Sequence, residues 1–113
     1  MIIEWLEDFR NGWLKKDIKF VLDLFADDVE YWETPFKKLQ GKDYMALEWR
    51  AIGYQEHISL STDVFNAENE KFAVNWQLTY KIRNTMKSCA GVYLIRLDKG
   101  GKCNYFMQVG EEK

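Results

Sequence analysis

Hydrophobic residues recur every three or four positions at the start of the chain and every second position in much of its second half. The first spacing is typical of amphipathic helices, and the second is typical of strands with one buried face. Residues 2–15 carry a helical face made of Ile2, Trp5, Leu6, Phe9 and Trp13. Gly12 inside this helix costs about 1 kcal/mol relative to Ala, so we expect another element to pack closely against it.

Two further helices are predicted before Gly53. Asp17 is placed to cap the second helix, and the acidic pair at residues 27–28 is placed to end it. The apolar face of that helix consists of Ile18, Val21, Leu22 and Phe25. After a turn at Gly41, Asp43 is placed to cap the third helix. The third helix carries Tyr44, Met45, Leu47, Trp49 and Ile52.

Strands are predicted both between the second and third helices and after Gly53. The first begins at Asp28 and is stopped by Pro35, the only proline. The clearest alternation gives one apolar face to Phe72, Val74, Trp76, Leu78, Tyr80 and Ile82. Other strands are expected near 57–64, 88–97 and 102–109, with turns at "NAENEK", "RNTMK" and "DKGGK". Helices followed by antiparallel strands indicate an α+β fold with the helices on one face of the sheet.

Composition places the chain among single globular domains. It has 113 residues, of which 47% are hydrophobic and 16% aromatic, so one core and either bulky packing or a cavity lined by rings are expected. The net charge is −2 and the 16 Lys and Arg are scattered, which argues against nucleic acid as a partner. No apolar run has membrane-spanning length and the N-terminal residues are charged, so no membrane association and a cytoplasmic location are expected.

The cysteines and the histidine offer little chemistry. A hairpin at the "DKGGK" turn would place Cys103 opposite residue 96, far from Cys89, so free thiols are expected. His57 has no Cys or His at ligand spacing, so no metal and no cofactor are predicted. His57 is either a proton shuttle or a single exposed side chain at the start of a strand.

The stretch "DVEYWETPF" contains the main candidate for chemistry. Alternation places Val29, Tyr31 and Glu33 on one face of the first strand. If that face is buried, Glu33 is a functional acid in a pocket. Burial among neighbouring rings would then raise its pKa toward the range useful for proton abstraction. The alternative is a strand end in water, or an acid paired with Lys37 or Lys38.

Three stretches carry a resemblance to a known family. They are "ETPFKKLQGKDYMALEW", "QEHISLSTDVFNAENEKFAVNWQLTY" and "GVYLIRLDKGGKC". Over about residues 5–109 the chain resembles the SnoaL-like branch of the nuclear transport factor 2-like (cystatin-like) superfamily. The resemblance implies a cone-shaped, curved antiparallel sheet wrapped over three N-terminal helices. It also implies a pocket for a small apolar molecule, because such cones enclose cavities.

The resemblance extends more distantly to ketosteroid isomerases, through "LFADD" and loosely through "GEEK". In that family a carboxylate on the first strand is the general base, and a tyrosine and a protonated acid are the oxyanion donors. Counting along the matched segments places the base position at Glu33. The tyrosine position falls on Phe9, which has no proton to donate, and the protonated-acid position falls on Tyr93. The resemblance therefore gives catalytic roles to Glu33 and Tyr93. The residue types themselves favour the other interpretation of Tyr93, a buried ring whose hydroxyl is satisfied locally.

The expected pocket residues are aromatic: Phe9, Trp13, Tyr31, Trp49 and Trp76. The leading function is binding of a small apolar molecule, with cofactor-free proton transfer of the isomerase, cyclase or dehydratase type as a further activity. The alternative is a non-catalytic module for ligand sequestration or protein contacts. A homodimer is expected through the sheet, where Asn75, Gln77 and Thr79 form either the contact or a solvated face.

Overall fold

A computed structural model describes all 113 residues. Six strands form one sheet in the order β2-β1-β6-β5-β4-β3. The strands are β1 (Phe25–Thr34), β2 (Lys37–Leu39), β3 (Glu56–Glu68), β4 (Lys71–Ile82), β5 (Thr85–Leu97) and β6 (Cys103–Glu112). Neighbouring strands are antiparallel except β1 and β6, which run parallel. The β1–β6 pair is parallel, whereas the sequence predicted only antiparallel pairs.

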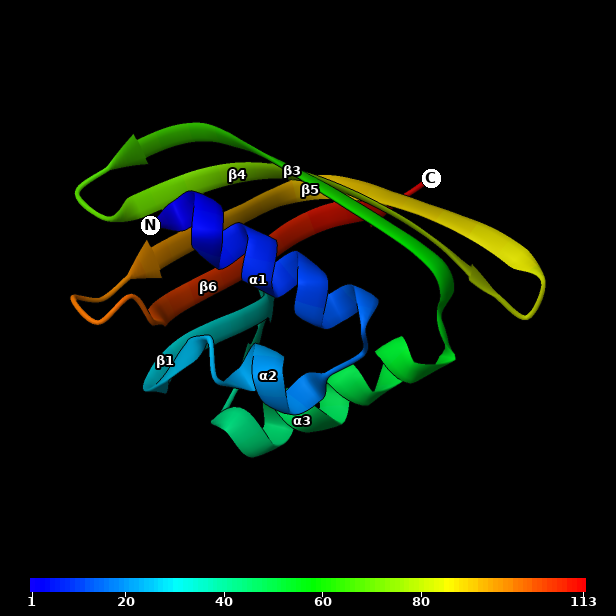
Figure 1. The fold of residues 1–113 in the computed structure, drawn as a ribbon, viewed down its shortest axis with the longest axis horizontal. Helices are drawn as coiled ribbons and strands as arrows, with labels where there is room; N and C mark the ends of the chain where they lie inside the picture. The colour runs from blue at the N-terminus through cyan, green and yellow to red at the C-terminus, as the bar shows by residue number, and fades with distance from the viewer.

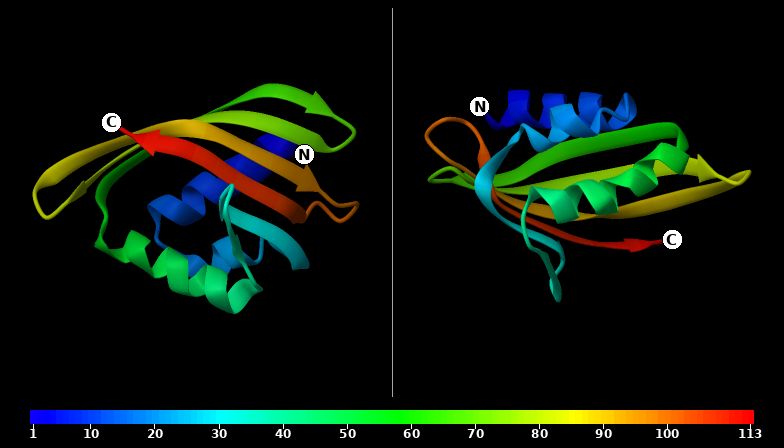
Figure 2. Two further views of the ribbon diagram at one scale, coloured as in Figure 1. Left: turned by 180° about the vertical axis from the view of Figure 1, so that it is seen from behind. Right: turned by 90° about the horizontal axis from the view of Figure 1, so that it is seen from below.

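Three helices lie on one side of the curved sheet (Figure 1). They are α1 (Ile2–Leu14), α2 (Ile18–Leu22) and α3 (Lys42–Trp49), and a 3-10 turn, η1 (Arg50–Tyr54), continues α3. No helix covers the opposite side (Figure 2). The structure thus has the predicted α+β architecture, a curved sheet wrapped over N-terminal helices.

The core lies between α1 and the inner face of the sheet. Phe9 is fully buried, and its ring contacts those of Phe25, Tyr93 and Phe106. The predicted alternation on β4 is confirmed, because Val74, Trp76 and Leu78 are buried while the residues between them face outward. Burial of this many rings supplies most of the driving force for folding.

Two glycines allow the close approaches that shape this core. A Cβ atom at Gly12 would lie 2.5 Å from Cγ2 of Val21, so the predicted close packing against α1 comes from α2. A Cβ atom at Gly110 would lie 2.4 Å from Cζ2 of Trp76. Glycine at position 110 therefore lets the Trp76 indole lie directly on the backbone of β6.

Several predicted boundaries are wrong. The second helix ends at Leu22, and Phe25 already belongs to β1, because it pairs with Cys103 of β6. Asp17 does cap α2, accepting a hydrogen bond from the Phe20 N–H at 3.1 Å. The third helix begins after Gly41 with no side-chain cap, so Asp43 is not its N-cap. The strand β2 was not predicted, and β3 to β6 are each longer than expected.

Candidate ligand-binding cavity

A cavity of about 290 Å³ lies between the helices and the inner face of the sheet, near the C-terminal end of α1. Five aromatic residues line it: Trp13, Tyr31, Trp49, Trp76 and Tyr80. Two acids, Glu33 and Glu48, also line it, and no Lys, Arg or His does. The remaining lining is aliphatic or neutral, and includes Cys89 of β5 and Gln108 of β6.

Strand alternation and helical spacing bring these side chains together. On β1, Tyr31 and Glu33 are two residues apart and therefore share the inner face. On β4 the same rule places Trp76 and Tyr80 on the inner face. The two tryptophans Trp13 and Trp49 meet above them from α1 and α3, with ring centroids 5.0 Å apart.

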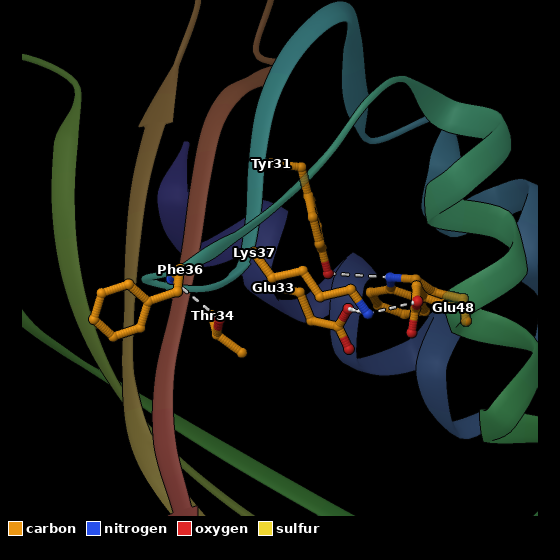
Figure 3. A network of polar contacts seen from close by, with 7 residues as sticks. Tyr31, Glu33, Thr34, Phe36, Lys37 and Glu48 are labelled. Carbon is orange, nitrogen blue, oxygen red and sulfur yellow. Dashed lines mark hydrogen bonds and ion pairs between the residues drawn. The ribbon is translucent and has the colours of Figure 1, made fainter.

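Hydrogen bonds fix most of the aromatic lining. The Trp49 indole N–H donates to the Tyr31 hydroxyl oxygen at 3.1 Å (Figure 3), and the Trp13 indole N–H donates to Oε1 of Gln55 at 3.2 Å. Burial raises the pKa of Tyr31 far above its ordinary value, although the bond from Trp49 works in the opposite direction. Tyr31 is therefore a neutral phenol at physiological pH.

An ion cluster lies at the edge of the cavity. Lys37 of β2 places its Nζ atom 2.9 Å from Oε1 of Glu48 and 3.2 Å from Oε2 of Glu33 (Figure 3). The hydrogen bond to Glu48 is the main cause that raises the pKa of Lys37, and Glu33 adds to it. The Lys37 side chain is 52% exposed, so solvent screens this cluster.

Two buried polar groups beside the cavity have no partner in the protein. These are the Trp76 indole N–H and the Tyr93 hydroxyl. Glu33 Oε2 is also buried and accepts no hydrogen bond, and its polar contact is the ion pair with Lys37 at 3.2 Å. Native proteins pair nearly all buried polar groups, so the unpaired Trp76 N–H on a lining residue marks this cavity as a candidate ligand site.

The structure places five of the seven predicted site residues on the cavity lining. These are Trp13, Tyr31, Glu33, Trp49 and Trp76. Phe9 and Tyr93 are fully buried and do not line it. Both touch the lining from behind: Tyr93 stacks on Trp76 at 5.3 Å, and Phe9 packs edge-on against Trp13 and Trp49.

Sequence reasoning did not identify two of the lining residues that matter most. Tyr80 lies on the same alternating face as Trp76, so the strand pattern already contained the signal for it. Glu48 had no such signal, because its place at the cavity depends on how α3 crosses the end of β1. Its contact with Lys37 joins two residues that are eleven positions apart.

A larger hollow of about 570 Å³ lies elsewhere, beside the β3–β4 turn. Its lining is half hydrophobic and half polar, and includes the charged residues Glu68, Lys71 and Arg96. None of the unpartnered buried polar atoms belongs to a residue that lines it. We therefore consider the smaller aromatic cavity to be the candidate site.

No group of three metal-ligating side chains comes together anywhere in the chain. No helix has both the length and the apolar character needed to cross a bilayer.

Solved structures with the same fold come from several bacteria, although no curated protein is similar enough in sequence to count as a relative. RV0760c from Mycobacterium tuberculosis matches with a TM-score of 0.84 and 15% identity, over 98% of this chain and 95% of that one. Its complex with estradiol-17beta-hemisuccinate matches with a TM-score of 0.78 and 16% identity, over 93% and 89%.

Two other proteins extend the comparison. The Delta 5-3-ketosteroid isomerase from Mycobacterium sp. matches with a TM-score of 0.80 and 17% identity, over 98% of this chain and 97% of that one. A protein with a ketosteroid isomerase-like fold from Catenulispora acidiphila, in complex with trimethylamine, matches with a TM-score of 0.75 and 15% identity, over 92% and 82%. At such identities the likeness concerns the fold alone. The family model of the SnoaL-like domain matches residues 6–105, so this chain belongs to the SnoaL-like domain family.

Proposed function

We propose that this protein binds a small, largely apolar molecule in the cavity lined by Trp13, Trp49 and Trp76. The observation that carries the proposal is a hollow lined by aromatic rings, among them Trp76, whose buried indole N–H has no acceptor in the protein. Such a combination of apolar walls and a few unpaired polar groups is typical of ligand sites.

The size of the cavity limits the ligand. A volume of about 290 Å³ falls at the lower end of the range for ligand pockets, roughly 300–1,000 Å³. The solved neighbours RV0760c and the Catenulispora protein hold small molecules on the same fold, which supports the class of ligand and not its identity. We expect a compact molecule with one or two polar groups.

The Trp76 indole gives the ligand a polar anchor. Four of the five indole N–H groups donate hydrogen bonds within the protein, and that of Trp76 alone does not. An acceptor on the ligand, such as a carbonyl or hydroxyl oxygen, would satisfy this N–H. The bond is worth about 1 kcal/mol or more, because the donor is otherwise buried and unpaired.

Proton transfer is the second candidate activity, and the position of Glu33 on the lining favours it. Glu33 would take a proton from a carbon next to a carbonyl. Tyr93 is the donor that the resemblance suggested, but it is fully buried, stacks on Trp76 and does not line the cavity. Trp76, whose indole N–H has no acceptor, is a lining residue and is the alternative donor.

The binding proposal is tested by filling the cavity. Isothermal titration calorimetry with 3-tert-butylphenol should detect binding to the wild-type protein. Ala51→Phe adds a ring to a lining residue of η1 and should weaken binding about tenfold or more. The control Ala67→Phe adds the same ring to an exposed site on β3 that does not line the cavity. Equal binding by the two variants would overturn the proposal.

Catalysis has its own test. Exchange of the α-hydrogens of 4-tert-butylcyclohexanone for deuterium, followed by NMR, should be accelerated by the wild-type protein and not by Glu33→Gln. Retained 3-tert-butylphenol binding by that variant would show that only the base was lost. Absence of exchange with intact binding would leave the rival function, a non-catalytic ligand-binding module.

The homodimer remains a proposal as well. Asn75 and Gln77 lie exposed on the side of the sheet that no helix covers. A dimer of standard interface size would cover about 800 Å² of that side on each partner. A monomer mass by light scattering at micromolar concentration would reject it.

A further inference from the structure

The cavity has a charge pattern that the binding of an apolar molecule does not explain. Glu33 and Glu48 both line it, while Lys37 is the one cation within ion-pair distance of either. Two carboxylates share one ammonium, so this edge of the cavity carries an excess of one negative charge. The lining has no basic residue of its own to offset that excess.

The other titratable groups of the lining supply no compensating charge. Burial raises the pKa of Tyr31 on β1, of Tyr80 on β4 and of Cys89 on β5, so all three are neutral at neutral pH. The acids therefore act on whatever occupies the cavity without competition from other lining charges. Only Lys37, from β2, competes.

The rings provide the second half of the pattern. Five aromatic side chains surround the space beside the two acids, and a positive charge over an aromatic face is stabilised by the ring quadrupole. Aromatic walls with acids at one end favour an organic cation, because each element attracts positive charge and neither attracts an anion.

We propose that the ligand of this cavity is a small organic cation, an ammonium group on an apolar body, with its charged end between Glu33 and Glu48. This inference rests on the proposed function and names the class of ligand. The Lys37 ammonium occupies the position that the ligand's charge would take, 2.9 Å from Glu48 and 3.2 Å from Glu33. Because the Lys37 side chain is half exposed, it can turn into solvent when a ligand enters.

The Glu33 oxygen that faces Lys37 supports this assignment. Glu33 Oε2 is buried and its polar contact is the Lys37 ammonium at 3.2 Å, so it is left without a cation once Lys37 turns into solvent. A protonated amine in the cavity has N–H groups to donate to it, whereas a hydrocarbon or a carboxylate has none. The apolar body of the ligand would then lie against Trp49 and Trp76.

A matched pair of probes tests the charge alone. 3-Hydroxyphenyltrimethylammonium and 3-tert-butylphenol have nearly the same shape, and differ in a positively charged nitrogen in place of a carbon. In a site without charge preference the neutral probe binds more tightly, because removing water from a tert-butyl group costs less free energy than removing it from a charged trimethylammonium group. We expect calorimetry to give the cation the lower dissociation constant, by about tenfold.

Variants then identify the source of that preference. Glu48→Gln and Glu33→Gln should each reduce the cation preference about three- to tenfold, with little change for the neutral probe. Lys37→Met should strengthen cation binding, because it removes the internal competitor. Asp43→Asn changes the net charge equally at an exposed site of α3 outside the cavity, and should change nothing.

Three outcomes separate the two proposals. A cation preference that Glu48→Gln reduces and Asp43→Asn does not supports the inference. Equal or tighter binding of the neutral probe to the wild-type protein overturns the inference and leaves the proposed function standing. Failure of both probes to bind overturns both. Thermal unfolding of each variant, followed by circular dichroism, verifies that lost binding is not lost folding.

Discussion

The interior of this protein has two ends that use the same kinds of residue differently. Around Trp5, Phe9, Phe25 and Phe106 the rings pack directly on one another, and none of these four residues lines the cavity. We call this the packed end. Around Trp49, Trp76 and Tyr80 similar side chains line a space of about 290 Å³, which we call the hollow end. Aromatic content therefore does not distinguish a core from a binding site.

The two ends differ in whether their buried polar groups have hydrogen-bond partners. Trp5 and Trp76 are each 4% exposed. At the packed end the Trp5 indole N–H donates to the carbonyl oxygen of Leu24 at 3.0 Å, while the Trp76 N–H has no acceptor. An unpaired buried donor costs roughly 1–3 kcal/mol, so the hollow end gives up stability that a ligand can return. This difference is the physical basis of the proposed function.

The largest expected effect comes from truncating a leucine at each end. Leu97→Ala at the packed end should cost about 4 kcal/mol, near the upper part of the range for such changes. Leu78→Ala at the hollow end should cost about 2 kcal/mol, because Leu78 already faces empty space on one side and loses fewer contacts. Urea unfolding measures both, and equal costs would contradict the distinction.

The cysteines provide the next effect, through pH. Burial raises the pKa of Cys103 at the packed end to about 12 from an ordinary value near 9. Between these values the unfolded thiol has lost its proton and the folded thiol keeps it, so the stability of the fold falls as pH rises. From pH 9 to pH 11 the Cys103 contribution to this loss should be about 2–3 kcal/mol, since each unit is worth 1.36 kcal/mol.

Cys103→Ala isolates that contribution, because Tyr31 and Tyr93 titrate in both proteins and cancel. The variant should lose less stability than the wild-type protein over this interval. Cys89→Ala is the control at the hollow end, where Cys89 is only half buried and a smaller change is expected. A larger change from Cys89→Ala would mean that the two ends have been assigned wrongly.

A smaller effect concerns the indole groups themselves. Trp5→Phe removes a hydrogen bond to the Leu24 carbonyl oxygen, which still accepts the Cys103 backbone N–H at 2.9 Å, whereas Trp76→Phe removes a donor that has no partner. The first change should therefore destabilise the protein by about 1 kcal/mol more than the second. Denaturant midpoints that coincide for the two variants would show that Trp76 is satisfied in solution.

The smallest expected effect is that of Lys37→Met on stability. The ion pairs of Lys37 with Glu33 and Glu48 are exposed, and exposed pairs contribute little. The unfolding midpoint should shift by no more than the scatter of repeated measurements. A clear loss of stability would mean that Lys37 holds the hollow end together and is not free to leave it.

The sequence predicted helices and strands well where the spacing of hydrophobic residues fits only one kind of element. The faces of α1 and β4 follow from spacing alone, because each buries a single continuous side. Phe25 was assigned wrongly because it fits the helical spacing of Ile18 and Val21 and also fits a strand. Its parallel pairing with Cys103, more than seventy residues away, decides in favour of the strand.

The site was predictable to the same extent. Glu33 and Tyr31 were placed on the inner face by alternation, and the structure brings them to the cavity. The ion cluster was anticipated only as one of several alternatives for Glu33, and the second acid, Glu48, was missed. Whether Tyr93 faces a cavity or a ring depends on the Trp76 indole, whose position requires glycine on β6. No local pattern encodes such a three-way contact.

The five tryptophans offer the most direct test of the central claim, that the hollow end is the ligand site. Trp13, Trp49 and Trp76 line the cavity, and Trp5 lies at the packed end. Trp32 does not line the cavity, and its indole N–H donates to Oε2 of Glu30 at 2.8 Å. Titration of the ¹⁵N-labelled protein with 3-tert-butylphenol should shift the indole resonances of Trp13, Trp49 and Trp76, with Trp76 moving furthest as its N–H gains an acceptor. Shifts confined to Trp5 or Trp32, or saturable binding that leaves Trp76 unmoved, would contradict the account.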